Sequence, residues 1–411
     1  MNKVQCISPV DGSVYVERAY ASDTEVSATL NRAAEASREW RGLSLAERAK
    51  YCSALVDAFV AMPGHAEEIA RQMGRPIRYG EGEVNGFAER ARCMIGLAEE
   101  ALSDIALPEK SGFKRYLRRE PVGVWLTVAP WNYPYLTSVN SVIPSLMVGN
   151  AVILTHSHQT PLCAERFVEA GEKAGLPEGL FQYLHLSREQ TAQVIKAPQI
   201  GGVAFTGSVA GGVDIEQSAA GRFIPVGLEL GGKDPAYVRP DANFQHTVEN
   251  VVDGAFFNSG QSCCGIERVY VHADLYEKFV DAFVDLKKQD VVRESLDEAT
   301  TLGPMVRTAA ADFVRGQIAE AVDGGAKALI DPKSFAADEP GTPYVAPQVM
   351  VDVDHSMRVM NEESFGPVVG IMKVTDDEEA IRLMNDSDLG LTASIWTADV
   401  DAAEAIGNRV E

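Results

Sequence analysis

The sequence has few cysteines and histidines, and their spacing is not that of a metal site or a disulfide framework. Six cysteines are spread over 411 residues, and the seven histidines include a single close pair, His156 and His158. No Cys-x-x-Cys or His-Glu-x-x-His stretch occurs, although zinc sites commonly carry such spacings. Because reducing compartments keep thiols free, we expect neither a metal site nor structural disulfides.

Positive charge and long apolar runs are scarce as well. The chain has 37 Lys and Arg against 59 Asp and Glu, a net charge of −22, which repels nucleic acid and anionic lipid. The start, MNKVQCISPVDGS, has no long apolar core, and no uninterrupted apolar run approaches the roughly 18 residues of a transmembrane helix. We therefore expect a cytoplasmic protein without nucleic acid or membrane partners, long enough for two domains with sizeable cores.

The order of apolar segments predicts an α/β fold. A helical N-terminal third carries capping-box spacing at Ser22 with Glu25 and at Ser44 with Glu47. From about residue 115, short apolar runs alternate with helix-length segments, at 124–129, 151–154, 181–186, 203–207 and 224–230. Such runs are typical of a parallel sheet covered on both faces, so a doubly wound sheet is expected. The texture changes near residue 232, and later strand and helix signals predict a second α/β lobe.

A doubly wound sheet often binds a nucleotide, but the usual fingerprint Gly-x-Gly-x-x-Gly after the first strand is absent. Residues 203–212, VAFTGSVAGG, instead predict a strand that runs into Gly207-Ser208 and then a helix. The amides and positive dipole end of a helix N-terminus suit a pyrophosphate. Taken alone, the stretch is more often just a tight turn between strand and helix, and both interpretations stay open.

Four motifs in one order are more specific than any of these features: PWNYP (130–134), LELGGK (228–233), FFNSGQSC (256–263) and EESFGPV (362–368). Together they resemble the aldehyde dehydrogenase superfamily, from SPVDGS near the N-terminus to the last residue. The resemblance implies a Rossmann-like cofactor domain (1–106 and 122–231), an oligomerisation arm (107–121) and a second α/β, catalytic domain (232–411). It also implies oxidation of an aldehyde to the carboxylic acid with NAD or NADP.

The resemblance assigns the chemistry to three residues. Cys263 matches the nucleophile of the motif Phe-x-x-x-Gly-Gln-x-Cys, and a thiolate attacks an aldehyde readily. Its neighbour Cys264 is expected to face away, because successive side chains of an extended strand point to opposite faces. Asn132 and the Cys263 amide match the donors to the oxyanion.

Glu229 matches the general base that activates water against the thioester, a role suited to a carboxylate whose pKa burial raises toward neutrality. Relatives that transfer the acyl group to coenzyme A lack, as a group, a carboxylate at this position. Glu229 therefore favours hydrolysis to the free acid.

The cofactor contacts implied by the family match at Trp131, Gly207, Ser208, Glu363 and Phe365, with Glu363 expected to hold the nicotinamide ribose and Phe365 to pack beside the ring. Two cofactor positions depart from the pattern. Thr155 stands where relatives carry a Lys that binds the adenosine ribose, and His158 where they often carry a Glu that favours NAD. The lost ammonium should weaken cofactor binding, and the missing Glu removes a repulsive element against a 2′-phosphate. The choice between NAD and NADP stays open.

The substrate pocket is expected to involve Tyr133, Thr137, Asn140, Ser262 and Cys264, a polar set that favours a small polar aldehyde or a semialdehyde. Family members continue beyond the final GNRVE, so the chain is expected to lack the usual C-terminal segment. In the family, that C-terminal segment pairs with another subunit, and the arm segment 111–123, with its apolar-polar alternation, matches the family's partner for it. The resemblance therefore implies a homodimer or homotetramer if the C-terminal segment is present in the native protein.

Two other classes of function remain as hypotheses. Thr155 and the short C-terminus suit a non-catalytic scaffold or binding member of the fold. Cys263 and Glu229 alone would also suit a thiol esterase that works without a cofactor.

Overall fold

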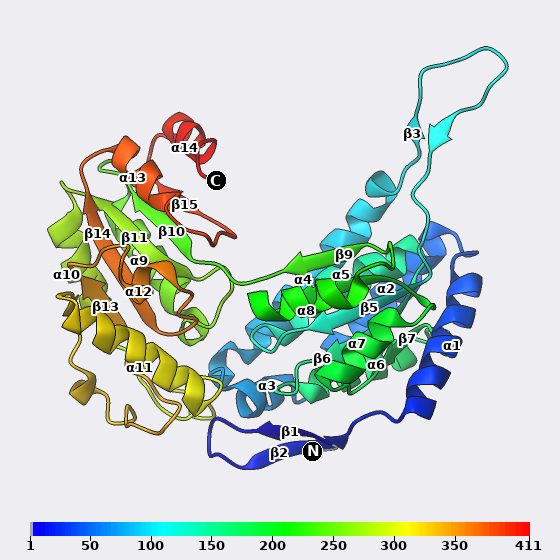
Figure 1. Cartoon of the computed structure of the whole chain (residues 1–411), viewed down its shortest axis with the longest axis horizontal. Coiled ribbons are helices and arrows are strands. Elements are labelled where there is room, and N and C mark those ends of the chain that lie inside the picture. Colours follow the sequence, from blue (N-terminus) through cyan, green and yellow to red (C-terminus); the bar gives the residue numbers. More distant parts are fainter. Residues whose placement is uncertain (1–2) are drawn as a thin grey trace. The chain divides into compact units, whose positions relative to one another are not determined.

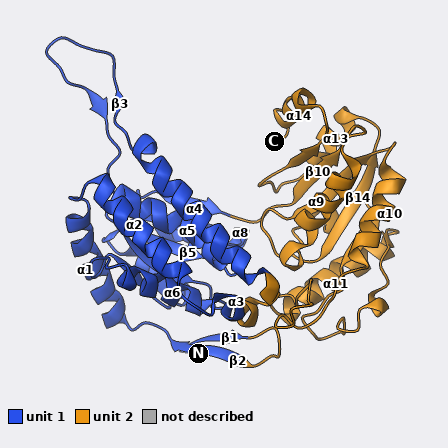
Figure 2. Ribbon diagram, turned by 180° about the vertical axis from the view of Figure 1, so that it is seen from behind, with its two compact units in different colours: residues 1–7, 14–68, 79–229 blue, residues 8–13, 69–78, 230–411 orange. Residues whose placement is uncertain are grey.

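The computed structural model describes residues 3–411 (Figure 1). The chain divides into two compact units, coloured separately in Figure 2. Unit 1 comprises Met1–Ile7, Val14–Glu68 and Tyr79–Glu229, and unit 2 comprises Ser8–Ser13, Ile69–Arg78 and Leu230–Glu411. The last passage of the chain from one unit to the other therefore falls between Glu229 and Leu230, inside the LELGGK motif. Among residues 3–411, no helix is both long and apolar enough to cross a membrane.

Unit 1 is built around a five-stranded sheet. Its elements, with α3 reaching into unit 2, are β1 (Lys3–Ile7), β2 (Val14–Ala19), α1 (Asp23–Trp40), α2 (Leu45–Val60), α3 (His65–Met73), α4 (Gly80–Ala101), β3 (Ile105–Ala106), β4 (Tyr116–Leu117), β5 (Val124–Ala129), α5 (Pro134–Val148), β6 (Ala151–His156), α6 (Pro161–Lys173), β7 (Phe181–Tyr183), α7 (Arg188–Lys196), β8 (Ile200–Thr206), α8 (Val209–Ala219) and β9 (Val226–Glu229).

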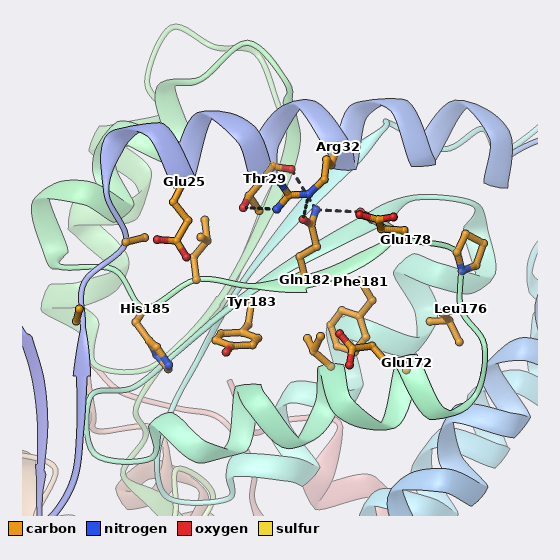
Figure 3. Close-up of a pocket in the computed structure, with 17 residues that line it drawn as sticks. Glu25, Thr29, Arg32, Glu172, Leu176, Glu178, Phe181, Gln182, Tyr183 and His185 are labelled. Atoms are coloured by element: carbon orange, nitrogen blue, oxygen red, sulfur yellow. Dashed lines mark hydrogen bonds between the residues drawn. The ribbon is translucent and has the colours of Figure 1, made fainter.

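The sheet has the order β7-β6-β5-β8-β9, with every pair parallel. Each of the five strands overlaps one of the five predicted apolar runs. Strand β7 is shorter than its run, because residues 184–186 leave the sheet. Helix α1 packs on β5, β6 and β7, and Figure 3 shows it on the opposite side of β7 from α6. The doubly wound α/β prediction is confirmed, and the strand order reverses between β5 and β8.

The helix caps follow the sequence signals with one difference. At α2, the Ser44 hydroxyl accepts the Glu47 amide and the Glu47 carboxylate accepts the Ser44 amide, so the capping box is complete. At α1, the Ser22 side chain accepts the amide of Glu25, which is the hydroxyl half of the same arrangement. Such caps satisfy amides that have no partner within the helix.

Unit 1 also contains two antiparallel strand pairs outside its main sheet. The antiparallel pair β1 and β2 was not predicted, because its strands are short and mixed in polarity. The other pair, β3 and β4, forms the base of the long loop seen in Figure 1. This loop is the predicted arm: only Tyr116–Leu117 of the alternating segment 111–123 is a strand, and its partner precedes residue 107. Phe113 and Leu117 remain more than half exposed.

Unit 2 is built around a six-stranded sheet. Its elements are a short 3-10 turn at Ile77–Tyr79 that reaches the start of unit 1, then β10 (Asp234–Val238), α9 (Phe244–Phe256), a turn at Phe257–Gly260, β11 (Ile266–His272), α10 (Tyr276–Lys287), α11 (Thr308–Asp323), β12 (Lys327–Ala328), a 3-10 turn at Pro332–Ser334, β13 (Gln348–Val351), α12 (Arg358–Asn361), β14 (Val368–Val374), α13 (Asp377–Met384), β15 (Ser394–Trp396) and α14 (Val400–Gly407).

This second sheet has the order β12-β13-β14-β11-β10-β15 and is parallel except for β12. Side chains alternate between two cores, as the pleat of a strand requires. Val269 and Val271 of β11 join the core formed with α9 and α10. Tyr270, between them, joins the core formed with α13 and α14. The sheet is thus covered on both faces, and unit 2 is the second α/β lobe that the sequence predicts.

Candidate active site

The site residues predicted in unit 1 gather at one edge of its sheet. Four of the five strands bring predicted residues there: Trp131 and Asn132 follow β5, Thr155 lies next to the end of β6 with His158 just beyond, Gly207 and Ser208 follow β8, and Glu229 ends β9. In a parallel sheet the carboxyl ends of the strands lie at the same edge, and ligands bind there where the strand order reverses. That reversal falls between β5 and β8, so the topology alone points to a nucleotide site between Asn132 and Gly207.

Asn132 is buried, with 4% of its surface exposed, in the turn between β5 and α5. The turn is anchored by Glu83 of α4, whose Oε1 accepts the amides of Tyr135 and Leu136, both at 3.0 Å. A carboxylate at a helix N-terminus satisfies amides and meets the positive dipole end. Glu83 therefore fixes the first turn of α5 and, with it, the position of Asn132. The sequence analysis did not single out Glu83.

The two departures from the family pattern lie at the end of β6, one buried and one hydrogen-bonded. Thr155 is the penultimate residue of β6 and is buried. The next residue, His156, binds the Pro134 carbonyl through Nε2 (3.1 Å) and the Thr160 hydroxyl through Nδ1 (2.9 Å), and burial lowers its pKa to about 4. His158 contacts the Leu186 carbonyl at 2.9 Å. Thr155 and His156 therefore bring no charge to the end of β6 at neutral pH.

The start of α8 combines a capped helix with an apolar surface. Ser208 is the N-cap, and its hydroxyl accepts the Gly211 amide at 3.2 Å. A Cβ at Gly207 would lie 2.6 Å from the Phe205 ring, so packing against Phe205 requires glycine there. Val209 and Val213, each 45% exposed, lie four residues apart on one face of the helix. The strand-turn-helix prediction is confirmed, and the helix start has both polar and apolar groups for a nucleotide.

Glu229 differs from the expectation in one respect. Its carbonyl accepts the Gly207 amide at 2.9 Å, which ties the end of β9 to the turn after β8. Its side chain, however, is exposed, because β9 is the edge strand of the sheet and alternates between half-buried and exposed residues. The expectation that this side chain is buried is therefore wrong.

The site residues predicted in unit 2 also share one edge. They lie on two loops, Gln261–Gly265 before β11 and Glu363–Gly366 before β14, and a third loop, Gly231–Lys233, enters the amino end of β10. These three strands are neighbours in the sheet, in the order β14-β11-β10, and run parallel. The fold therefore brings Cys263, Glu363 and Phe365 to the same edge.

The chain reaches Cys263 through a strained turn. Asn258, Ser259 and Gly260 have φ values of 56°, 58° and 69°, a conformation that costs about 1–3 kcal/mol for each non-glycine residue. The turn is fixed by buried hydrogen bonds: Arg75 Nε donates to Asn258 Oδ1 (3.1 Å), and Ser259 Oγ to the Gly303 carbonyl (2.8 Å). A Cβ at Gly260 would lie 2.2 Å from the Gly366 carbonyl. Only glycine lets this turn approach the loop that carries Glu363.

Gln261 completes the frame behind the cysteine. Its side chain accepts the Val306 amide (2.8 Å) through Oε1 and donates to the Asn258 carbonyl (3.1 Å) through Nε2. The Gly and Gln of the motif are therefore explained by geometry rather than by chemistry. Strained backbone that its surroundings hold in place is typical of functional sites.

The two cysteines lie in a turn rather than in a strand. The Gly265 amide donates to the Ser262 carbonyl at 3.1 Å, and β11 begins only at Ile266. Cys263 is half-buried and Cys264 is exposed. Their thiols share a hydrogen bond, which raises the pKa of Cys263 and lowers that of Cys264 to about 5. The expectation that Cys264 faces away rested on an extended strand, and that premise is wrong, because both residues lie in a turn.

The loop that carries Glu363 and Phe365 is clamped by a buried ion pair that the sequence analysis did not identify. Lys233 Nζ contacts Glu267 Oε2 at 2.5 Å, with Lys233 fully buried. Glu267 also accepts the amides of Ser364 (2.8 Å) and Phe365 (2.9 Å). The sequence did contain a signal for this ion pair: the charged residues Glu267 and Arg268 stand inside the otherwise apolar strand IERVYVH. Charged side chains that are buried normally have a charged or hydrogen-bonding partner.

Glu363 itself is tuned by this environment. The Gly232 amide donates to its Oε1 at 3.2 Å. Burial, and then the negative charge of Glu267, raises its pKa to about 7, and the Gly232 amide and Lys233 oppose the rise. Near the loops of unit 2, Glu363 is therefore a carboxylate whose pKa lies close to neutrality.

The predicted substrate residues fall into two groups. The first group lies at the start of α5 and consists of Tyr133, Thr137 and Asn140, which helical spacing places near one another. Thr137 Oγ1 donates to the Tyr133 carbonyl at 2.6 Å. Asn140 is exposed, and its Oδ1 accepts from Arg90 Nη1 at 3.2 Å. In unit 2, Ser262 Oγ and Cys264 Sγ lie 3.5 Å apart. Each group offers polar atoms, as expected for a polar aldehyde.

A cavity of about 580 Å³ in unit 1 contains none of the predicted site residues. It lies between α1, β7 and α6, and in Figure 3 Arg32 binds Thr29 and Gln182 along its wall. The lining has no cysteine. This cavity is therefore not the proposed site of the reaction. Among residues 3–411, no group of three or more His, Cys, Asp or Glu side chains could hold a metal ion.

Comparison with known proteins decides the family. Residues 1–411 match the Aldehyde dehydrogenase family over their whole length. The chain belongs to the aldehyde dehydrogenase family. It is 34% identical over 408 residues to a Mycobacterium avium protein named succinate-semialdehyde dehydrogenase [NADP(+)], with 98% of this chain and 85% of that protein covered. It is 33% identical to geranial dehydrogenase of Castellaniella defragrans, with 93% and 81% covered.

A solved structure agrees with this assignment. The succinic semialdehyde dehydrogenase of Streptococcus pyogenes, in complex with NADP+, matches with a TM-score of 0.93 and 30% identity, covering 99% of this chain and 89% of that one. The present aldehyde dehydrogenase is therefore an oxidoreductase that oxidises an aldehyde with NAD(P)+. The resemblance inferred from the four motifs is confirmed, whereas the roles of individual residues remain predictions.

Proposed function

We propose that this aldehyde dehydrogenase forms a covalent thioester on Cys263 and releases the free acid by hydrolysis. The observation that carries the proposal is the turn at Asn258–Gly265, where strained backbone, buried hydrogen bonds and a required glycine hold Cys263 beside the loop of Glu363. Thiolates are good nucleophiles toward carbonyl carbon. Such precise support of one half-exposed thiol suits a nucleophile better than a structural cysteine, which is normally buried.

The remaining steps are assigned to two residues at the edge of the unit 1 sheet. Asn132 stabilises the oxyanion formed by attack, because it is buried and held by the turn that Glu83 anchors. Glu229 activates the water that hydrolyses the thioester. Since Glu229 is exposed, we propose that water reaches it directly and that a bound substrate supplies the desolvation which the side chain lacks here.

The cofactor fits the edge of the unit 1 sheet. NAD(P)+, when bound, supplies the hydride acceptor that no side chain can provide. Trp131, Gly207 and Ser208 would hold it from unit 1, and Val209 and Val213 offer an apolar surface for the adenine. Glu363 and Phe365 would hold the nicotinamide riboside.

We favour NADP over NAD. No acidic side chain stands at Thr155 or His158 to repel a 2′-phosphate, and the Mycobacterium avium and Streptococcus pyogenes relatives are named or solved with NADP.

For the substrate we propose an aldehyde that also carries a carboxylate. Tyr133, Thr137 and Asn140 present a polar surface, and Arg90 lies against Asn140 with an exposed side chain. A guanidinium suits a carboxylate. The relatives named for succinic semialdehyde have such a substrate.

We further propose a cytoplasmic homodimer or homotetramer. All six cysteines are free, as the proposed thiol chemistry requires. The β3–β4 loop exposes Phe113, Tyr116 and Leu117, apolar groups that suit an interface between copies.

The proposal predicts that Glu229→Gln stops the reaction after one turnover. The variant should release about one NAD(P)H per subunit in a burst and then turn over at least about 10²-fold more slowly, since a general base contributes about 10²–10⁴-fold. Stopped-flow absorbance at 340 nm measures both phases. Glu216→Gln replaces an exposed residue of α8, serves as the control and should keep wild-type kinetics. A wild-type steady state in Glu229→Gln would contradict the role of Glu229.

Cofactor affinity should depend on pH through Glu363. With its pKa raised from 4.5 to about 7, this carboxyl is protonated in the free enzyme below about pH 6 and ionised above about pH 8. Because an ionised carboxylate accepts hydrogen bonds from ribose hydroxyls more strongly, NADP+ should bind several-fold more tightly at the higher pH. Titration calorimetry at both values tests this, and Glu363→Gln should remove the dependence. A dependence that persists in the variant would assign it to another group.

The same shift has the opposite effect on stability. The folded chain holds the Glu363 proton more tightly than the unfolded chain, so ionisation of Glu363 lowers the free energy of unfolding as pH rises from about 4.5 to about 7.

A further inference from the structure

The cavity between α1, β7 and α6 follows an unpaired edge of the unit 1 sheet. Among residues 3–411, β7 is the outermost strand on this side and pairs with β6 alone. Edge strands present backbone amides and carbonyls that can pair with another chain. The proposed reaction uses none of the residues that line this cavity of about 580 Å³, so the edge has no role in it.

The hydrogen bonds to β6 show which backbone groups of β7 face the free side. The β6 backbone donates to the Leu180 carbonyl at 2.8 Å and accepts the Leu184 amide at 3.0 Å. Neighbouring residues of a paired strand direct their backbone groups to alternate sides. The amides and carbonyls of Phe181 and Tyr183 therefore point away from β6, along the free edge.

The chain itself already pairs with the next group on this side. The His185 carbonyl accepts the Ala21 amide at 2.9 Å, from the segment that enters α1. His185 lies two residues beyond Tyr183, so its carbonyl faces the same way. Within residues 3–411, this pairing stops short of Tyr183, and no backbone hydrogen bond from outside the sheet reaches Phe181 or Tyr183. The edge thus has room for another backbone.

Side-chain hydrogen bonds hold α1 above this edge (Figure 3). Gln182 donates to the Thr29 carbonyl at 3.1 Å and accepts from Arg32 Nε at 3.0 Å. Arg32 also donates to the Thr29 hydroxyl at 3.2 Å. A Cβ at Gly179, whose φ is 79°, would lie 3.0 Å from the Arg32 carbonyl, so glycine lets the loop before β7 approach α1. The wall on the α1 side is therefore fixed.

The lining of the cavity carries excess negative charge. Glu25 of α1, Glu172 of α6 and Glu178 of the loop before β7 line it with exposed side chains. None of the three forms an ion pair with any of residues 3–411. Of the described lining residues, Arg32 is the sole Lys or Arg, and its guanidinium is engaged by the bonds above. The lining is therefore complementary to a basic partner.

The carboxylates lie on both faces of the strand. In Figure 3, Gln182 points toward α1, whereas Phe181 and Tyr183 point toward α6. Consecutive residues of an added strand would also point to alternate faces. One basic side chain would therefore approach Glu25 on the α1 side, and the next would approach Glu172 on the α6 side.

We propose that the free edge of β7 is a docking site for an extended segment of a partner protein that carries adjacent Lys or Arg residues. The segment adds to the sheet as a further strand, a common way of binding peptides. Backbone hydrogen bonds to Phe181 and Tyr183 supply the affinity, and the three carboxylates select basic side chains. Because β7 has only three residues, binding is weak and reversible.

The test measures how a fluorescein-labelled peptide of Lys-Lys-Val repeats binds the full chain, by fluorescence anisotropy at about 0.15 M salt, where distant charges are screened. We expect saturable binding. The same peptide with alternate backbone nitrogens methylated keeps its charge but loses its amide donors, and it should bind at least about tenfold more weakly. A peptide with Glu in place of Lys should not bind.

Tyr183→Pro tests the edge directly. Proline removes the Tyr183 amide, which faces the free side, and edge strands tolerate proline in that orientation. The peptide should bind at least about tenfold more weakly, because an amide is lost and the proline ring stands at the edge. Tyr183→Ala keeps the amide and should retain affinity within about threefold.

A charge variant tests the carboxylates without altering the backbone. Replacing Glu25, Glu172 and Glu178 together by Gln should weaken peptide binding at least about fivefold, because each exposed pair contributes modestly. The matched control removes three exposed carboxylates of α4 instead and should change the affinity less than about twofold: Glu89, Glu99 and Glu100.

Two results would overturn the proposal. Equal binding of the methylated peptide, or equal weakening by both charge variants, would reduce the effect to general attraction toward a chain of net charge −22. Self-association that Tyr183→Pro abolishes, without peptide binding, would make a second copy the occupant. Aldehyde oxidation is measured separately at 340 nm, so failure of this proposal leaves the proposed function untouched.

Discussion

Replacing Cys263 by alanine is expected to reduce aldehyde oxidation by at least about 10³-fold, because removal of a covalent nucleophile leaves only binding and oxyanion stabilisation. The variant should still bind NAD(P)+, since Glu363 and the unit 1 edge are unchanged. Initial rates at 340 nm, together with cofactor titration, separate a lost nucleophile from a lost fold.

Cys264→Ala is the matched control for this prediction. It removes a thiol of the same turn and should reduce the rate less than about tenfold, through altered contacts with substrate and the lost hydrogen bond to Cys263. The structure makes this control informative, because Cys264 carries the lowered pKa. Loss of activity in Cys264→Ala with activity retained in Cys263→Ala would assign the nucleophile to residue 264 instead.

The second large effect concerns the buried clamp. Glu267→Ala should lower the free energy of unfolding by about 3–5 kcal/mol, since it leaves the fully buried Lys233 ammonium without its partner. The amides of Ser364 and Phe365 also lose their acceptor. Urea unfolding measures the change, and the freed loop should weaken NAD(P)+ binding as well.

Two comparisons sharpen this test. Glu277→Ala breaks the exposed Lys373–Glu277 pair in the same unit and should change stability by less than about 1 kcal/mol. Lys233→Met combined with Glu267→Gln removes the stranded ammonium and keeps an acceptor for one loop amide, so it should regain part of the stability. If Glu267→Ala were as mild as Glu277→Ala, the clamp would not hold the loop.

Much of the fold followed from the sequence because its strands are short, apolar and regularly spaced. The run 124–129 became β5 with the predicted bounds, and all five predicted runs became strands of one parallel sheet. The β1–β2 hairpin escaped because its residues mix polar and apolar types. In the segment predicted as the oligomerisation arm, only two residues on each side pair, and its role stays a prediction.

The site was predicted less completely than the fold. Motifs identified Cys263, Glu229 and Glu363, and the structure places their segments at sheet edges suited to ligands. Exposure could not be read from sequence: Glu229 was expected to be buried, but it ends an edge strand. The turn at Cys263 was mistaken for a strand because strand β11 starts only three residues later. Glu267 was missed because its partners, Lys233 and the loop amides, are distant in sequence.

The most direct test of the account is absorbance at 340 nm on the purified chain with NAD or NADP supplied separately, against short aldehydes that include succinic semialdehyde. We predict NAD(P)H formation that is faster with NADP and with carboxylate-bearing aldehydes, and that is absent in Cys263→Ala. A flat trace with both cofactors from correctly folded protein, or equal rates in the Cys263→Ala variant, would contradict it.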